Sequence, residues 1–120
     1  APSRGLGDVY KRQVQGIALA KRYIDSNYSQ NITLDSLAEI THINKFYLAH
    51  SFTECVGQSP INYLTDRRLE ACKELLVSSN LSVAQVATSV GFSSQSYFSQ
   101  IFRKKTGMTP RQYRSRYARK

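Results

Sequence analysis

The chain has 120 residues and a formal net charge of +9, from 17 Lys and Arg against 8 Asp and Glu. This length suffices for one domain, or for two small subdomains that share an element, and it excludes a multidomain enzyme. Residues 75–120 hold eight basic residues and no acid, whereas residues 1–74 hold nine basic residues and all eight acids. A half without carboxylates attracts polyanions, although charge alone leaves a merely soluble basic surface as an alternative.

Residues 1–13 contain two glycines and a proline among mixed charges, without a sustained hydrophobic period. We interpret them as a linker, a frayed end or a remnant of cloning, and we expect the folded domain to occupy residues 14–120. From Val14 onward apolar residues recur with helical spacing, so Ile17 and Ile24 are expected to face a core.

A pair of short helices is predicted in the first subdomain, residues 14–57. Thr33 is a suitable N-cap for a helix over residues 34–40, and Asn44 is a suitable N-cap for a helix over residues 45–56. Two short helices joined by a tight turn are typical of the helix-turn-helix motif. The side chains expected to face inward on the second helix are Leu48, Ser51, Phe52 and Cys55.

A long helix is predicted within residues 58–78, where it joins the two subdomains. Gly57 suits the end of the preceding helix, and Ser59 followed by Pro60 suits the start of the next one, which runs to Ser78. Part of its charge is expected to pair on a solvated helix face. The residues concerned are Asp66, Glu70 and Glu74 with Arg67, Arg68 and Lys73.

The second subdomain, residues 79–120, repeats this order of signals. Ser82 is a suitable N-cap for a short helix, and Gly91 suits a turn that requires a positive φ. A second helix is predicted over residues 95–106. Ser93 or Ser94 is its N-cap, and Gly107 ends it. The side chains expected to face inward are Tyr97, Phe98, Ile101 and Phe102. A last helix is predicted from Pro110, with Tyr113 and Tyr117 as its packing residues.

The chain contains an internal repeat, because residues 47–63 and 93–113 share a skeleton of aromatic residues, glycine and proline. Four positions match at an offset of 50 residues: Phe52 with Phe102, Gly57 with Gly107, Pro60 with Pro110, and Tyr63 with Tyr113. Two copies are too few for a solenoid. The predicted fold is therefore all-α, with about seven helices in two helix-turn-helix subdomains joined by a long linker helix.

The sequence does not favour an enzyme or a metal protein. It holds no HExxH motif and no phosphate-cradling glycine loop, and His42 and His50 have no acidic partners in register. We therefore predict no catalytic residues, no metal and no cofactor. Cys55 and Cys72 form no CxxC pair and are expected to be buried, reduced thiols of a cytosolic protein. No apolar run approaches the ~18 residues of a membrane span.

The helix over residues 95–106 has the chemistry of a DNA-reading helix. Its apolar face leaves a polar face outward, where glutamine can bond adenine bidentately and serine can bond several bases. Plain solvated surface is the alternative for Gln95 and Gln100. The predicted base contacts are Gln95, Ser96 and Gln100, with Ser99 on the same face. The predicted phosphate contacts are Ser94, Arg103, Lys104 and Arg111, and Lys105 follows in the same basic run.

The equivalent helix over residues 45–56 carries a different outer face. Phe46 would suit a thymine methyl group, with packing against the preceding helix as the alternative, and Ala49 offers only its own methyl. The predicted base contacts are Lys45, Phe46, Ala49 and His50, with Thr53 also outward, and Asn44 is a predicted phosphate contact. We expect this helix to be the more methyl-directed reader and the second helix to supply most of the affinity.

The segment 82–113 combines a helix of small residues, a Gly-Phe turn, Ser-Tyr-Phe, Gly-x-Thr-Pro and Tyr. Together with residues 14–81 and Arg114, it resembles the DNA-binding domain of AraC-type transcriptional regulators. The resemblance implies sequence-specific duplex DNA binding by a bacterial regulator, with two recognition helices in successive major grooves. By position it implies base reading by Phe46, Ala49, His50, Gln95, Ser96 and Gln100.

The resemblance also implies the partners. They are a double-stranded DNA operator and RNA polymerase, and no membrane is involved. The effector or dimerisation domain of the family is missing from this chain, so we expect it to be cut from a longer protein. The competing class is a basic protein-interaction or RNA-binding module, in which Tyr97 and Tyr113 would stack on bases. Their repeat partners Tyr47 and Tyr63 favour structural tyrosines instead.

Overall fold

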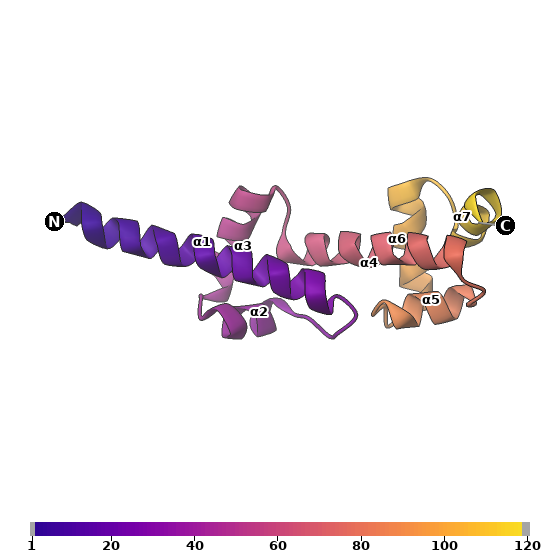
Figure 1. Ribbon diagram of the computed structural model, residues 1–120, viewed down its shortest axis with the longest axis horizontal. Coiled ribbons are helices and arrows are strands. Elements are labelled where there is room, and N and C mark those ends of the chain that lie inside the picture. The colour runs from indigo at the N-terminus through magenta and orange to yellow at the C-terminus, as the bar shows by residue number, and fades with distance from the viewer. Residues whose placement is uncertain (1, 119–120) are drawn as a thin grey trace. The chain divides into compact units, whose positions relative to one another are not determined.

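The computed structural model describes residues 2–118, with side chains from residue 10 onward. In these residues the backbone forms seven α-helices and no strand, as Figure 1 shows. The all-α prediction is confirmed. The helices are α1 (Pro2–Asn27), α2 (Leu34–Thr41), α3 (Lys45–Val56), α4 (Pro60–Ser78), α5 (Val83–Ser89), α6 (Gln95–Thr106) and α7 (Pro110–Tyr117).

Helix α1 begins at Pro2, well before the expected start at Val14. The expectation that helical structure begins at Val14 was therefore wrong. Proline is tolerated in the first turn of a helix, where its missing N–H has no intrahelical partner. Each glycine costs about 1 kcal/mol of helix propensity, which weakens a helix without breaking it. That residues 1–13 lie outside the domain stays a prediction.

The chain divides into two compact units. Unit 1 comprises residues 1–27 and 32–64, and unit 2 comprises residues 28–31 and 65–120. Helix α4 runs through the boundary, so its first turn packs in unit 1 and the remainder packs in unit 2. Each unit contains one helix-turn-helix: α2 and α3 in unit 1, and α5 and α6 in unit 2.

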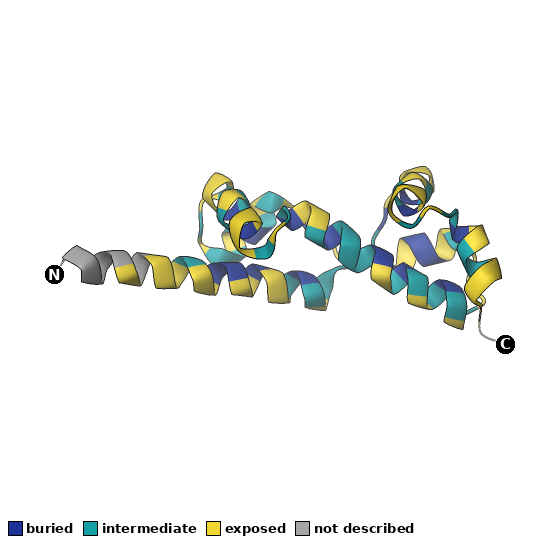
Figure 2. Cartoon of the chain, turned by 90° about the horizontal axis from the view of Figure 1, so that it is seen from above, coloured by how far each residue is buried: buried dark blue, intermediate teal, exposed yellow. Residues whose placement is uncertain are grey.

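The core of unit 1 forms between α1, α2 and α3, which contact one another pairwise. Helix α1 presents a stripe of buried side chains at spacings of three and four, which Figure 2 shows in dark blue. The fully or almost fully buried side chains of this unit include Ile17, Ala20, Ile24, Leu37, Leu48 and Phe52. The Tyr63 ring meets the Phe52 ring edge-on at 5.8 Å, and its hydroxyl donates to Asp25 at 2.6 Å.

The core of unit 2 repeats this arrangement, with α4 in the place of α1. Leu69, Cys72 and Leu76 form its buried stripe, again at spacings of three and four. They cluster with Val86, Ala87, Val90, Phe92, Phe98 and Phe102. The Tyr113 ring meets the Phe102 ring edge-on at 5.5 Å, so the aromatic pair of unit 1 recurs. Burial raises the pKa of the Cys72 thiol to about 12.

The predicted helix ends are confirmed, because the expected capping residues perform their roles. Thr33 accepts a hydrogen bond from the Ser36 amide at 3.0 Å, and Ser82 accepts one from the Gln85 amide at 3.1 Å. Left-handed glycines end α3 and α6, with φ of 94° at Gly57 and 79° at Gly107. Local chemistry therefore determines the starts of α2 and α5 and the ends of α3 and α6.

Two side chains predicted to face inward do not. Tyr97 is 52% exposed, and Cys55 is exposed. Adjacent residues on a helix point about 100° apart, so Tyr97 cannot share the core direction of the fully buried Phe98. Cys55 lies in the last turn of α3, three residues after the fully buried Phe52. The expected burial is confirmed for Cys72 only.

Candidate nucleic-acid interface

The start of α3 presents an exposed aromatic side chain. Phe46 is 73% exposed, which does not support its alternative as a residue packed against the preceding helix. It borders an open hollow on unit 1. The other lining residues are Gln13, His42, Ile43, Asn44, Tyr47 and His50. Ala49 is partly buried and His50 is exposed, so Phe46 and His50 dominate the outer face of α3.

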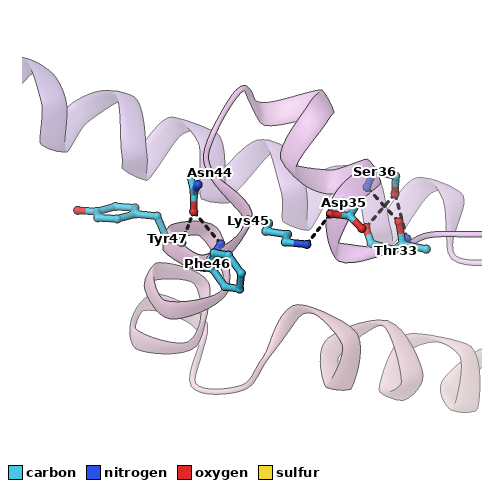
Figure 3. A network of polar contacts seen from close by, with 7 residues as sticks. All are labelled: Thr33, Asp35, Ser36, Asn44, Lys45, Phe46 and Tyr47. Atoms are coloured by element: carbon cyan, nitrogen blue, oxygen red, sulfur yellow. Dashed lines mark hydrogen bonds and ion pairs between the residues drawn. The ribbon is translucent and has the colours of Figure 1, made fainter.

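The Lys45 side chain extends from α3 toward Asp35 on α2. Its Nζ lies 3.2 Å from Asp35 Oδ1 and 5.3 Å from the centre of the Phe46 ring (Figure 3). The carboxylate already compensates this ammonium charge. Lys45, one of the four base contacts predicted on α3, must therefore leave this partner before it can reach DNA.

The two N-cap residues of the recognition helices keep a free donor. Asn44 Oδ1 accepts from the Phe46 amide at 3.0 Å and from the Tyr47 amide at 3.4 Å, which Figure 3 shows. Ser94 Oγ accepts from the Tyr97 amide at 3.2 Å. The amide NH₂ of Asn44 and the hydroxyl hydrogen of Ser94 are not used by these bonds, so capping is compatible with the predicted phosphate contacts.

His50 has an acidic partner that sequence reasoning missed. Its Nε2 lies 3.1 Å from Glu54 Oε1, one helical turn further along α3. The expectation that no acid lies in register with His50 was therefore wrong. The (i, i+4) spacing was visible in the sequence and is the signal that finds this pair. The pair places a carboxylate on the same helix as the predicted reading face.

Helix α6 exposes the residues predicted to read bases. Gln95, Ser96 and Gln100 are exposed, while Ser99 is partly buried. Arg103 and Lys104 are also exposed, and no side chain in the described part of the chain forms an ion pair with either. Helix α6 therefore combines uncompensated cations in its last turn with a face of neutral hydrogen-bonding groups that begins in its first turn.

The three consecutive basic residues of α6, Arg103, Lys104 and Lys105, differ in whether they form an ion pair. Lys105 Nζ lies 3.3 Å from Asp66 Oδ1 on α4, so this lysine is bound to the scaffold of unit 2. Arg111 is exposed in the first turn of α7, two residues after the N-cap Thr109. The structure thus leaves Arg103, Lys104 and Arg111 as the exposed basic residues of the predicted phosphate set.

Arg68 of α4 fastens a loop within unit 2. It was expected to pair along its own helix, but its Nε donates to the Tyr28 carbonyl at 2.6 Å and its terminal nitrogen donates to the Gln30 carbonyl at 2.8 Å. The guanidinium carbon lies 5.8 Å from the centre of the Phe92 ring. Burial lowers the pKa of Arg68, and the nearby Tyr97 phenol acts in the opposite direction. The expected pairing within α4 is confirmed for Lys73 with Glu70, at 3.0 Å.

The described residues contain no cluster of three or more His, Cys, Asp or Glu side chains that could hold a metal ion. Over the same residues, no helix combines the length and the apolar character that crossing a membrane requires. The geometry on the surface is that of two capped helices with exposed polar faces.

Comparison with known proteins identifies the family. A family model described as a helix-turn-helix domain matches residues 37–116, more than half of the chain. The C-terminal domain of AraT, a response regulator from Geobacillus stearothermophilus, is 36% identical and superposes with a TM-score of 0.84 over 88% of each chain. A probable AraC family transcriptional regulator from Rhodopseudomonas palustris is 25% identical, with a TM-score of 0.79 over 88% of this chain and 99% of that one.

Two further relatives bear on function. The DNA-binding domain of AdpA, solved in complex with a target DNA, is 25% identical, with a TM-score of 0.74 over 88% of this chain and 91% of that one. The Bacillus subtilis bifunctional transcriptional activator and DNA repair enzyme AdaA is 34% identical over 98 residues. The match covers 82% of this chain but 46% of AdaA, so the chain spans about half the length of that relative. The chain belongs to the AraC-type family of helix-turn-helix DNA-binding domains of transcription regulators.

Proposed function

We propose that this chain recognises a specific duplex operator through α3 and α6, each inserted into a major groove. The observation that carries this proposal is the surface of α6, where the exposed Gln95, Ser96 and Gln100 lie beside the unpaired cations Arg103 and Lys104. Hydrogen-bonding groups at base edges supply specificity, and cations at phosphates supply sequence-independent affinity. The solved complex of AdpA with DNA supports this use of the fold.

The predicted contacts divide by chemistry. On α6, glutamine amides match adenine, and Ser94, Arg103, Lys104 and Arg111 meet phosphates. On α3, the exposed Phe46 ring and the Ala49 methyl match thymine methyl groups, His50 and Lys45 supply polar contacts, and Asn44 meets a phosphate. For both recognition helices to enter the major groove of a straight duplex, they must lie ~34 Å apart, which is one turn of DNA, along one face of the duplex. A closer spacing requires the DNA to bend, which a gel-mobility phasing assay detects.

We also infer that the chain acts as a binding module within a longer regulator rather than as an enzyme. His42 ends α2 in the left-handed conformation, and His50 is paired with Glu54 on α3, so neither histidine forms part of a nucleophile-and-base arrangement that the sequence motifs indicate. Its partners are the operator and RNA polymerase, and it works in the cytoplasm, where bacterial DNA lies. The AdaA match supports a modular arrangement, because less than half of that bifunctional protein aligns with this chain.

Exposed aromatic side chains favour a second candidate, the binding of single-stranded RNA. Phe46, Tyr47 and Tyr97 are all exposed, and exposed aromatic rings are the feature on which unpaired bases stack. Membership of the helix-turn-helix family favours duplex DNA. Competition between duplex DNA and single-stranded RNA for the chain distinguishes the two candidates.

Selection of bound sequences from a pool of random duplexes tests the proposal most widely. We expect enrichment of a two-part site, with one part for each recognition helix. Single-stranded RNA should compete poorly with the selected duplex. Equal binding to random and selected duplexes, or stronger binding to the RNA, would contradict sequence-specific duplex recognition.

A further inference from the structure

Tyr47 and Tyr97 occupy the same position in the two recognition helices, three residues after the N-caps Asn44 and Ser94. Both side chains are large and half-exposed, at 47% and 52%. Their backbone amides already donate to the caps. The phenol is thus the polar group that each tyrosine still offers to a ligand.

The tyrosines lie on the flank of the reading face rather than on it. A residue that follows another on a helix points about 100° further round, so Tyr47 is turned away from Phe46 and Tyr97 from Ser96. Residues seven apart lie nearly in line, two turns along the helix. Tyr97 therefore shares its flank with Lys104, which is exposed and meets a phosphate in the proposed function.

The corresponding flank of α3 lacks that cation. Tyr47 lies in line with Glu54, which stands where α6 has Lys104 and whose Oε1 lies 3.1 Å from His50 Nε2. Figure 3 shows the Tyr47 ring directed away from the ion pair of Asp35 and Lys45. A phenol is a neutral hydrogen-bond donor, so the Tyr47 hydroxyl can bind a phosphate even though the Glu54 carboxylate lies on the same flank.

Among the described residues neither exposed phenol has a hydrogen-bond partner, although the Tyr97 phenol lies near the Arg68 guanidinium. The Tyr97 ring packs against the buried Phe92 ring, with the two ring centres 6.2 Å apart. The repeat-related tyrosines at the other matched position behave differently, since the Tyr63 hydroxyl donates to Asp25 at 2.6 Å inside unit 1. The exposed pair is therefore available to a partner of the recognition helices.

We propose that Tyr47 and Tyr97 each donate a phenolic hydrogen bond to a backbone phosphate of the duplex and so position the two recognition helices without reading sequence. This inference rests on the proposed DNA-binding function. It assigns one neutral phosphate contact to each helix-turn-helix. On α6 the phenol acts beside Lys104, and on α3 it acts without a cation on its flank.

The test compares Tyr47→Phe and Tyr97→Phe with the wild-type chain. Dissociation constants are measured on a duplex selected by the wild-type chain and on an unrelated duplex, over a range of salt concentrations. Each variant should weaken binding by about tenfold on both duplexes, because it loses one hydrogen bond to a charged group. The slope of log affinity against log salt should stay unchanged, since a neutral phenol releases no counterion.

Tyr10→Phe is the matched control, because Tyr10 is 69% exposed on α1 and lies outside both recognition helices. It should bind as the wild type does, and all three variants should keep the wild-type unfolding temperature. Unchanged affinity of Tyr47→Phe and Tyr97→Phe overturns the inference, and so does a loss confined to the selected duplex, which would indicate base contacts. A wild-type chain that binds no duplex would contradict the proposed function instead.

Discussion

Units 1 and 2 build the same core and then present different surfaces at the ends of their recognition helices. In the core, Phe52 and Tyr63 of unit 1 form the same edge-on pair as Phe102 and Tyr113 of unit 2. At the surface, Thr53, Glu54 and Cys55 of α3 stand where α6 has Arg103, Lys104 and Lys105. The comparison shows that the two copies share a core, while the basic residues at the end of the recognition helix occur in the second copy alone.

The turns between the paired helices differ as well. After α2 the chain passes through the left-handed region at His42, with φ of 58°, and after α5 it does so at Gly91, with φ of 105°. A Cβ at Gly91 would lie 2.9 Å from Arg68 Nε and 3.0 Å from the Ser29 carbonyl oxygen. Unit 2 therefore needs glycine for its backbone angle and for the close approach of the Arg68 clamp, whereas unit 1 tolerates a strained histidine.

Replacing Gly91 with Ala should have the largest effect on stability. We expect a loss of about 2–4 kcal/mol, because the substitution combines an unfavourable positive φ with displacement of Arg68 or the loop that it holds. Chemical denaturation monitored by circular dichroism measures this loss. Ser89→Ala on the neighbouring α5 should cost far less. A Gly91→Ala variant as stable as the wild type would contradict the requirement for glycine.

Replacing Gln100 with Ala should change the preference of the chain at one or two base positions, by ~1–3 kcal/mol if the contact is bidentate. His50 is its repeat partner on α3 and is paired with Glu54, so His50→Ala should change preference by less. Binding to a set of duplexes with single base changes measures both variants. Equal losses on every duplex would show that neither side chain reads a base.

Replacing His42 with Gly should have a smaller and opposite effect. Glycine adopts the left-handed conformation without steric strain but loses more entropy on folding, so we expect a net gain of about 0.5–1 kcal/mol. This change makes the turn of unit 1 resemble that of unit 2. Denaturation under the conditions used for Gly91→Ala measures it. A destabilised variant would mean that the His42 side chain contributes more than its backbone strain costs.

The helix bounds could be predicted because they depend on local chemistry. Asn44, Ser82 and Pro110 act at helix starts as expected, and Gly57 and Gly107 act at helix ends. The prediction of burial failed for Cys55, where exposure depends on the elements that cover the position, and for Tyr97, where helical periodicity already separates the side chain from Phe98. Helix α1 was predicted too short because two glycines weighed against a helix that the structure nevertheless forms.

The sequence could predict which helix faces form the candidate site, but it could not predict the ion pairs between side chains of different helices. The exposed faces of α3 and α6 follow from helical periodicity once the core side chains are known. The pairing of Lys45 with Asp35, and of Lys105 with Asp66, joins residues from different helices. Such pairs depend on how the helices pack, so the sequence alone could not separate compensated lysines from Arg103 and Lys104, which are free to bind phosphates.

The central claim is that unit 2 supplies most of the phosphate binding. The most direct measurement is the salt dependence of duplex affinity for the double variant Arg103→Ala/Lys104→Ala, compared with its repeat equivalent Thr53→Ala/Glu54→Ala. The slope of log affinity against log salt should fall by about 1.8 for the first variant, at ~0.9 for each phosphate that the protein no longer neutralises, and should not fall for the second. Equal slopes in the two variants, or an unchanged slope in the first, would contradict the claim.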